Sequence, residues 1–169
     1  KRVKCAMESL GHKQQDIEIL LIQMINIIQG DKIVKMSKRA GTSVTIKEML
    51  EEIENEAIRY FFVMRSPDTQ LDFDLDLAKS QSSDNPVYYI QYAHARICSI
   101  FDKIEQQARQ HNKEIGNASL HLLDTDQEQD LMRTISSYPE ILAVAARTRS
   151  PHLVANYLRE LAQNYHSYY

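Results

Sequence analysis

The prolines of this sequence set where its helices begin and end. Apolar residues follow Pro86 at positions 87, 90, 93, 97, 100, 101 and 104, a spacing that puts them on one helical face. Proline suits the first position of a helix and asparagine suits the position before it. Asn85-Pro86 therefore predicts the start of a long helix, with Asn85 as its N-cap, that frays near His111.

Two more helices are expected after residue 125. One covers residues 126–148, with a bend or interruption at Pro139, and the other covers residues 151–169 after the break at Ser150-Pro151. Three long amphipathic helices predict an antiparallel bundle. The apolar stripe of the last helix runs to the end of the sequence without a C-cap, and the first residue is not methionine, so we expect a piece of a longer chain at both ends.

The first half of the sequence predicts a small α/β unit. Residues 16–28 are β-branched and aliphatic, which favours a strand, and Gln29-Gly30-Asp31 predicts a turn into a second strand over residues 32–36. A polar loop over residues 37–42 leads to a helix over 46–53, begun by a capping box of Thr45 and Glu48, and then to a helix over 55–65. The predicted fold is mainly α: an α/β remnant over residues 1–78, then a helical bundle over 79–169, truncated at its C-terminus.

Composition excludes several classes of protein. No apolar run approaches the roughly 18 residues that span a bilayer, and the net charge of −3 gives no overall basic field for nucleic acid. Cys5 and Cys98 have no metal-ligand spacing, so we expect two reduced cysteines in a cytoplasmic protein, and no metal site. Asp72, Asp74 and Asp76 alternate without the closing residues of a calcium loop, which favours a solvated strand edge.

A local basic cluster carries the clearest chemistry. Lys35-Met36-Ser37-Lys38-Arg39 follows the second expected strand and enters a loop that contains Gly41. Mobile ammonium groups on such a loop can stabilise the charge that develops on pyrophosphate when the α-phosphate of ATP is attacked. The same residues also suit a solvated basic loop, so the motif alone leaves both interpretations open.

Four stretches of the sequence resemble the arginyl-tRNA synthetase family, a class I family. They are the motif with its continuation to Thr45, Ile58–Arg65, Leu71–Asp76 and, most specifically, Asp84-Asn85-Pro86-Val87-Tyr88-Tyr89-Ile90-Gln91-Tyr92-Ala93-His94-Ala95-Arg96-Ile97. The resemblance implies the end of a nucleotide-binding catalytic domain followed by a helical anticodon-binding domain. The family's other ATP signature, of the His-Ile-Gly-His type, is absent, so the chain alone is expected to be inactive.

The resemblance also implies a reaction and its participants. The full-length enzyme would join arginine to arginine tRNA with ATP and Mg²⁺, as a cytoplasmic and monomeric protein that does not bind membranes. No cofactor would be tightly bound to this piece. Lys35 and Lys38 would be catalytic, and Lys35, Met36, Ser37, Lys38 and Arg39 would bind ATP. Met36 is the one apolar residue of this set, and we expect it to anchor the loop on the core rather than to contact the ligand directly.

The tRNA contacts implied by the resemblance lie on two helices of the bundle. Tyr165 and Tyr169 share a face of the last helix, and aromatic rings there would stack on anticodon bases. Tyr165 also continues the apolar stripe, so core packing suits it equally, whereas Tyr169 favours stacking. Tyr92 and Arg96 are the candidates on the first long helix, and Arg96 suits either RNA phosphate or an acid such as Asp84.

Two alternatives stay open at this stage. The basic residues Arg147, Arg149, His152 and Arg159 suit either phosphate contact or capping of the preceding helix. The chain as a whole is also compatible with a non-catalytic RNA-binding or interaction module that keeps the basic motif as a surface feature.

Overall fold

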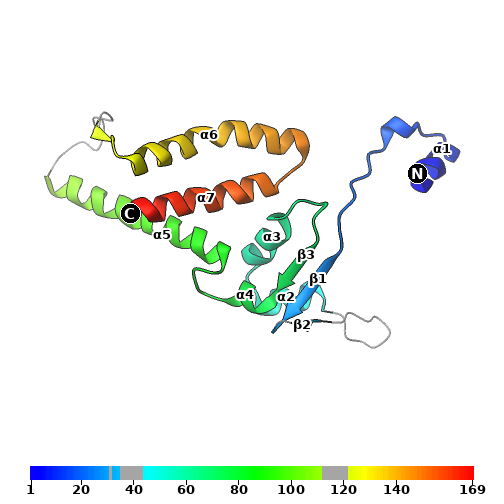
Figure 1. Cartoon of the computed structure of the whole chain (residues 1–169), viewed down its shortest axis with the longest axis horizontal. Helices are drawn as coiled ribbons and strands as arrows, with labels where there is room; N and C mark the ends of the chain where they lie inside the picture. Colours follow the sequence, from blue (N-terminus) through cyan, green and yellow to red (C-terminus); the bar gives the residue numbers. More distant parts are fainter. Residues whose placement is uncertain (31, 35–43, 112–121) are drawn as a thin grey trace.

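The computed structural model describes residues 1–30, 32–34, 44–111 and 122–169 (Figure 1). It confirms the expected fold class, because helices dominate and a small sheet precedes a helical bundle. The described helices are α1 (Arg2–Ser9), η1 (Gln14–Asp16), α2 (Ile46–Glu52), α3 (Asn55–Val63), α4 (Leu75–Lys79), α5 (Pro86–His111), α6 (Asp126–Thr148) and α7 (His152–Tyr168), and the strands are β1 (Ile25–Gln29), β2 (Lys32–Ile33) and β3 (Leu71–Asp74).

The sheet has the order β2-β1-β3. The predicted hairpin is confirmed: β1 and β2 are antiparallel, with Ile28 opposite Ile33, and Gly30 adopts a φ of 52° in the turn. Strand β3 comes from about 40 residues later in the chain and pairs with β1 in parallel, with Ile27 opposite Phe73. The sheet therefore joins both ends of the α/β part.

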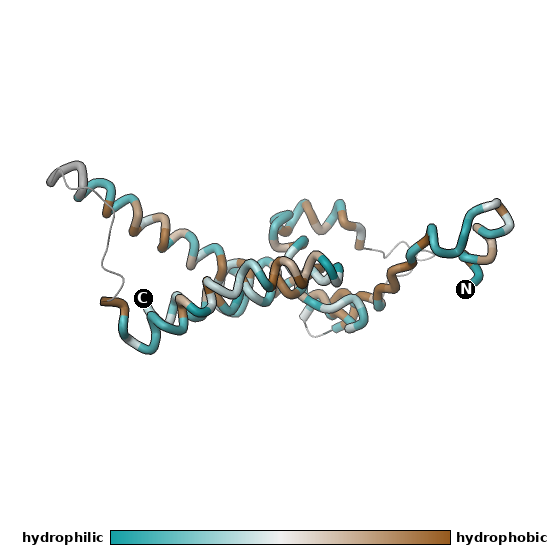
Figure 2. Tube along the Cα trace, turned by 90° about the horizontal axis from the view of Figure 1, so that it is seen from above, coloured by the Kyte–Doolittle hydropathy of each residue, from teal (hydrophilic) through white to brown (hydrophobic). Residues whose placement is uncertain are grey.

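The predicted strand over residues 16–28 is too long. Only Ile25–Gln29 pairs as a strand, and the apolar residues before it are exposed, with Leu21 at 81% and Ile22 at 74%. Figure 2 shows this apolar run between the N-terminal helix and the sheet. Its one backbone bond to another segment in the described chain is from Gln23 N to Pro67 O, at 2.8 Å. A strand needs a paired neighbour as well as β-branched residues, and this single backbone bond does not make a ladder with another described segment.

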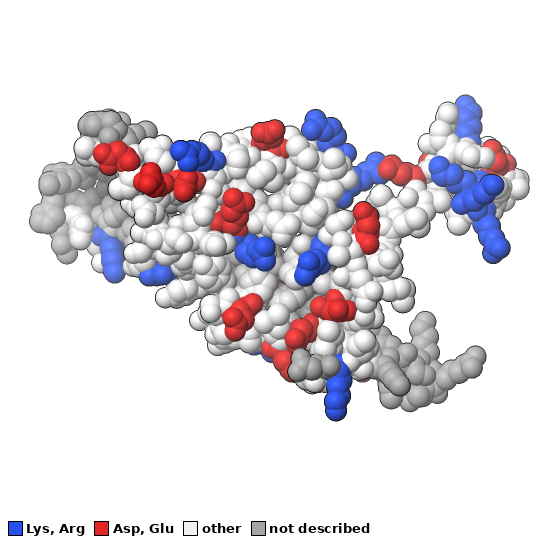
Figure 3. All heavy atoms as spheres, in the orientation of Figure 1, with Lys and Arg blue, Asp and Glu red and all other residues white. Residues whose placement is uncertain are grey.

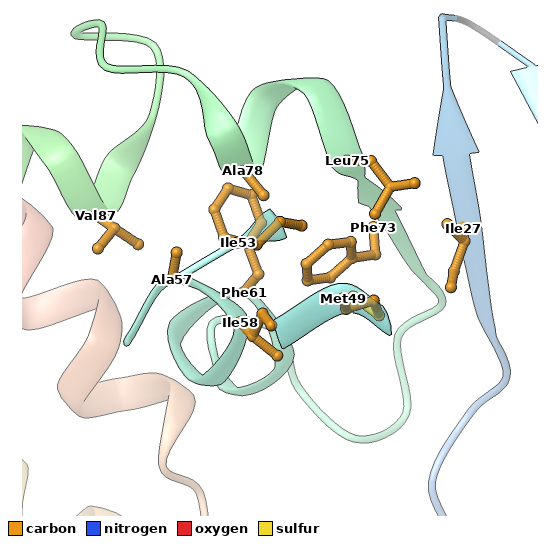
Figure 4. Packing of buried hydrophobic residues seen from close by; sticks show 10 residues of the cluster. All are labelled: Ile27, Met49, Ile53, Ala57, Ile58, Phe61, Phe73, Leu75, Ala78 and Val87. Carbon is orange, nitrogen blue, oxygen red and sulfur yellow. The ribbon is translucent and has the colours of Figure 1, made fainter. Parts of the chain in front are cut away.

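The core of the α/β part is built around two phenylalanines. Phe61 on α3 and Phe73 on β3 are fully buried, with ring centroids 5.5 Å apart (Figure 4). Ile27, Met49 and Ile53 close the cluster from β1, α2 and the end of α2. The predicted capping box starts α2, because the Thr45 side chain accepts from Glu48 N and the Glu48 side chain accepts from Thr45 N.

The three alternating aspartates do not form one strand edge, contrary to the prediction. Asp72 on β3 accepts a hydrogen bond from Asn26 on β1, at 2.8 Å. Asp74 is the N-cap of α4, which begins at Leu75, and Asp76 lies within that helix and accepts from Gly30 N, at 3.0 Å. The alternation ends because an N-capping aspartate turns the chain into a helix. Among the described residues no cluster of metal-ligating side chains is found.

Asn85 joins the α/β part to the bundle. Its side chain is buried at 4% exposure, donates to Ser80 O at 2.8 Å and Ala78 O at 3.3 Å, and accepts from Val87 N at 3.0 Å. The last bond is the predicted N-cap of α5, and the first two hold the end of α4. One amide side chain therefore fixes where α5 leaves the α/β part.

The bundle is arranged around α7, which packs against both α5 and α6 (Figure 1). Tyr60 on α3 donates to Ala155 O on α7 at 3.1 Å, and Asn164 on α7 donates to Thr134 Oγ1 on α6 at 2.8 Å. Helix α6 continues through Pro139 and ends at Thr148. Its C-cap is Arg149, the one described non-glycine residue with positive φ, at 53°. Within the described residues no helix is long and apolar enough to cross a membrane.

The first prediction concerns Asn85. Asn85→Ala should lower the free energy of unfolding by about 1–3 kcal/mol, because it leaves buried carbonyl groups without a donor. Asn85→Asp should be worse at neutral pH and partly recover at acidic pH, because a carboxylate would face the carbonyls of Ala78 and Ser80. Urea unfolding at both pH values measures the effect, with the exposed Asn55→Ala as control. Equal stability of the Asp variant and the parent at neutral pH would contradict this role.

The second prediction concerns the capping box of α6, where Thr125 and Glu128 bond reciprocally. The backbone hydrogen bond from Thr125 lowers the pKa of Glu128 below its ordinary 4.5. The stabilisation is therefore present above that value and disappears as the pH falls through the lower folded-state pKa. We expect Glu128→Gln to reduce the loss of stability between neutral and acidic pH, as measured by thermal unfolding, and Glu140→Gln on the same helix to leave it unchanged. Identical pH profiles for the two variants would refute the assignment.

Candidate nucleic-acid interface

Helices α5 and α7 lie side by side (Figure 1). They bring aromatic and basic side chains to a shared surface. Residues four apart share a helical face, so Tyr88, Tyr92 and Arg96 form a row along α5. The C-terminal turn of α7 contributes His166, and Tyr169 follows directly after that helix. We call these five residues the aromatic cluster.

Arg96 lies at the centre of the aromatic cluster. Its guanidinium carbon is 3.6 Å from the ring centroid of Tyr169 and 5.3 Å from that of Tyr92, so both rings make cation–π contacts with it. The contact with Tyr169 joins α5 to the end of the chain. The predicted partner Asp84 makes no ion pair with Arg96 in the described part of the chain.

His166 orients Arg96 and was not singled out by the sequence. Its Nδ1 lies 3.3 Å from Arg96 Nη1, and its Nε2 lies 3.3 Å from the carbonyl oxygen of Tyr89. Arginine can only donate, so Nδ1 accepts and Nε2 carries the proton that is donated to the carbonyl. The imidazole ring also stacks on Tyr92, with centroids 5.5 Å apart and planes inclined by 20°.

The tyrosines of the cluster present their rings to solvent. Tyr169 is 59% exposed, Tyr92 is 48% exposed and Tyr88 is 36% exposed. The rings of Tyr88 and Tyr92 are parallel to within 1°, with centroids 6.3 Å apart. Exposed and fixed aromatic faces beside a guanidinium suit the stacking of unpaired bases. Tyr88 was missed as a candidate, although its four-residue spacing from Tyr92 is visible in the sequence.

Tyr165 belongs to the core of the bundle. It is 8% exposed and packs with Ala93 and Ala162, so of its two interpretations the structure favours core packing. Its hydroxyl is buried without a hydrogen-bond partner among the described residues, and burial raises the pKa of this phenol. Its ring centroid lies 5.8 Å from that of Tyr169. It also contacts His166, at 5.7 Å between ring centroids, so it supports the aromatic cluster from the core side through Tyr169 and His166.

The residues expected to serve ATP lie outside the described part of the chain. This applies to Lys35, Met36, Ser37, Lys38 and Arg39. The residues before them are held by the sheet, since Val34 N donates to Ile27 O at 2.8 Å. The residues after them lead into the capping box at Thr45.

Positive and negative side chains are mixed over the surface, so any strong electrostatic field is confined to small groups of residues. Lys and Arg side chains alternate with Asp and Glu on the face drawn in Figure 3, in agreement with the small net charge. Of the basic residues near the α6–α7 turn, Arg149 forms an ion pair with Glu18, and that hydrogen bond lowers the pKa of the glutamate. His152 and Arg159 line a cavity between the end of α3 and the first turns of α7.

Two family models match adjoining parts of the chain. Residues 21–87 match the family described as tRNA synthetases class I (M), and residues 90–169 match the DALR anticodon binding domain. The fold and the sequence thus define the class: part of a class I tRNA synthetase catalytic domain followed by a DALR anticodon-binding domain.

Relatives and solved structures identify the particular family. The chain is 48% identical over 168 residues to the arginine–tRNA ligases of Thioalkalivibrio sulfidiphilus and Desulforamulus reducens, covering 99% of this chain and 29% and 30% of those proteins. A structure described as an arginyl-tRNA synthetase from Campylobacter jejuni aligns with a TM-score of 0.80 at 34% identity, over 99% of this chain and 36% of that one. The Thermus thermophilus arginyl-tRNA synthetase aligns with a TM-score of 0.63 at 28% identity, over 85% of this chain and 26% of that one.

The chain belongs to the arginyl-tRNA synthetase family, as the resemblance implied, and spans about 29% of the length of the curated relatives it matches.

The third prediction separates the buried tyrosine from the exposed one. Tyr165→Phe should leave the free energy of unfolding unchanged or raise it, because the lost hydroxyl has no partner among the described residues. Tyr165→Ala should lower it by about 3 kcal/mol or more. Tyr169→Ala should lower it by less than about 1 kcal/mol, because the ring is largely exposed. Chemical denaturation gives all three values, and a large loss in Tyr165→Phe would show an unidentified partner for the hydroxyl.

Proposed function

We propose that this chain recognises the anticodon loop of arginine tRNA through its aromatic cluster, within an enzyme that attaches arginine to that tRNA. The observation that carries the proposal is the position of Arg96 between the exposed rings of Tyr92 and Tyr169. The membership of residues 90–169 in the DALR anticodon-binding family supports it. The relatives' name, arginine–tRNA ligase, supports the choice of tRNA and amino acid.

The cluster suits an anticodon loop because unpaired bases expose their faces there. Tyr92 and Tyr169 would stack on bases, and Arg96 would hold both rings in place and contact a base or a phosphate. His166 and Tyr165 would act through their neighbours, His166 by orienting Arg96 and Tyr165 by supporting Tyr169. Residues 1–78 would form the catalytic remnant, and residues 79–169 would form the tRNA-binding bundle.

The ATP step is proposed for the full-length enzyme. Lys38 and Lys35 would stabilise charge on the departing pyrophosphate, with Met36, Ser37 and Arg39 completing the ATP-binding loop. ATP and arginine are substrates of that reaction, and Mg²⁺ would enter with the nucleotide, so we assign the ion no residue of this chain. We also propose a cytoplasmic protein, in keeping with two cysteines that form no disulfide among the described residues. We propose that it is monomeric, which sedimentation would test.

The fourth prediction tests recognition by titrating the chain with arginine tRNA and with anticodon-substituted tRNA. Tyr169→Ala and Tyr92→Ala should each weaken binding of the cognate tRNA by about 1–3 kcal/mol, the value for one stacked base. They should also narrow the difference between cognate and substituted tRNA. Tyr138→Ala, which removes a comparably exposed tyrosine from α6, is the matched control and should change neither quantity.

Two outcomes would redirect the proposal. Equal and weak binding of every RNA, abolished by moderate salt, would mean that the contact is only electrostatic. Anticodon-dependent binding that survives both substitutions would place the reading surface elsewhere on the bundle.

A further inference from the structure

A cavity of about 400 Å³ lies where the α/β part meets the bundle. One wall comes from the end of α3 and the turn that follows it, and the other from the first two turns of α7. Its lining residues are Tyr60, Met64, Arg65, Ser66, Thr69, Pro86, His152, Asn156 and Arg159. We call it the junction cavity.

The junction cavity is basic and contains no carboxylate. Arg65 and Arg159 come from opposite walls, and neither forms an ion pair or hydrogen bond within the described residues. The cavity of about 310 Å³ that α3 and α4 border is different, because Glu52 and Glu54 are among its lining residues. Both arginines are exposed, so their guanidinium groups border the cavity in contact with solvent and are free to meet an incoming anion.

The remaining polar groups of the cavity are hydrogen-bonding side chains. Ser66, Thr69 and Asn156 can each donate or accept, the Tyr60 hydroxyl already donates to Ala155 O, and His152 Nδ1 is buried without a partner among the described residues. The backbone N–H groups of Leu153 and Val154 at the start of α7 are already bonded to Ser150 and Pro151 carbonyls. Any anion held here would therefore be held by side chains, and the two arginines are the groups that can bind it in a bidentate manner.

A neighbouring cavity continues the junction cavity. A second cavity of about 590 Å³ shares Met64, Pro86 and Arg159 with the junction cavity, and its one acidic lining residue is Asp84. A single phosphate is smaller than either space, whereas a phosphodiester with its ribose suits a cavity with arginine, hydroxyl and amide groups.

We propose that the junction cavity binds a backbone phosphate of the RNA and its adjoining ribose, through Arg65 and Arg159. The inference rests on the proposed function, because it takes the RNA as ligand, but it concerns a separate site. The aromatic cluster would read bases along the first half of α5 and the end of α7, and the junction cavity would fix the backbone at the start of α7. Such a contact positions the RNA without reading its sequence.

The test is a salt series of tRNA binding with Arg65→Gln and Arg159→Gln. Each variant should weaken binding of cognate and anticodon-substituted tRNA equally, by roughly 3- to 10-fold at low salt, and reduce the slope of log affinity against log salt by about one. Arg159→Lys should retain the slope, because it keeps the charge. Arg133→Gln on α6 is the matched control, since Asp130 already pairs with that arginine, and it should leave the slope unchanged.

A second measurement does not depend on RNA. Titration with inorganic phosphate, against chloride at equal ionic strength, should shift the Nε–Hε signals of Arg65 and Arg159 in the NMR spectrum and leave that of Arg133 in place. Equal shifts at all three arginines would overturn the site. Unchanged affinity and slope in both Gln variants, with anticodon-dependent binding intact, would overturn it as well and leave the proposed function standing. If the unmodified chain binds tRNA without dependence on the anticodon, the proposed function is refuted. The phosphate titration would then still decide whether the junction cavity binds an anion.

Discussion

The side chain of Asn85 sets the position of the bundle relative to the sheet. Its amide group donates to the carbonyls at the end of α4 and its oxygen accepts from the first turn of α5, so the connection between the two parts has one geometry. A buried amide that satisfies three backbone groups is difficult to replace, since each orphaned group carries a desolvation cost. The Tyr60–Ala155 hydrogen bond adds a second point of attachment between α3 and α7. Together they determine that α3 and α7 face each other across the junction.

Helix α7 connects the features on which function depends. Its first turns border the junction cavity, Asn164 in its second half bonds to α6, and His166 near its end holds Arg96 on α5. A packed helix behaves as a rigid element, so displacement at one end is transmitted to the other. In the proposed complex, α7 would contact the RNA backbone at the junction and would also present the base-stacking surface. A shift of α7 would therefore affect both contacts.

Features set by neighbouring residues could be predicted from the sequence. The N-cap at Asn85, the capping box at Thr45 and the hairpin turn at Gly30 each involve residues within a few positions of one another, and all three are confirmed. The alternation around Asp74 was misread, because an aspartate between two apolar residues suits a strand and a helix cap equally well. The strand before Ile25 was overextended, because pairing depends on a neighbouring segment that periodicity does not reveal.

The candidate site depended more on tertiary contacts. Tyr92, Arg96 and Tyr169 were proposed from a resemblance, and the structure brings the three together around one guanidinium, while their role in RNA binding stays a prediction. His166 was overlooked because its importance lies in a contact with Arg96, 70 residues away. Arg65 and Arg159 face one cavity only because α3 docks on α7, and no local pattern signals that relation.

The open arrangement of the bundle has a thermodynamic consequence. Helix α5 packs on α7 but leaves Phe101 at 66% exposure, and Ile135 on α6 is 54% exposed. Unfolding would then uncover less new apolar surface than usual, and both the heat-capacity change and the denaturant m-value scale with that area. The chain should therefore melt over a wide temperature range and show a flat stability curve for its length.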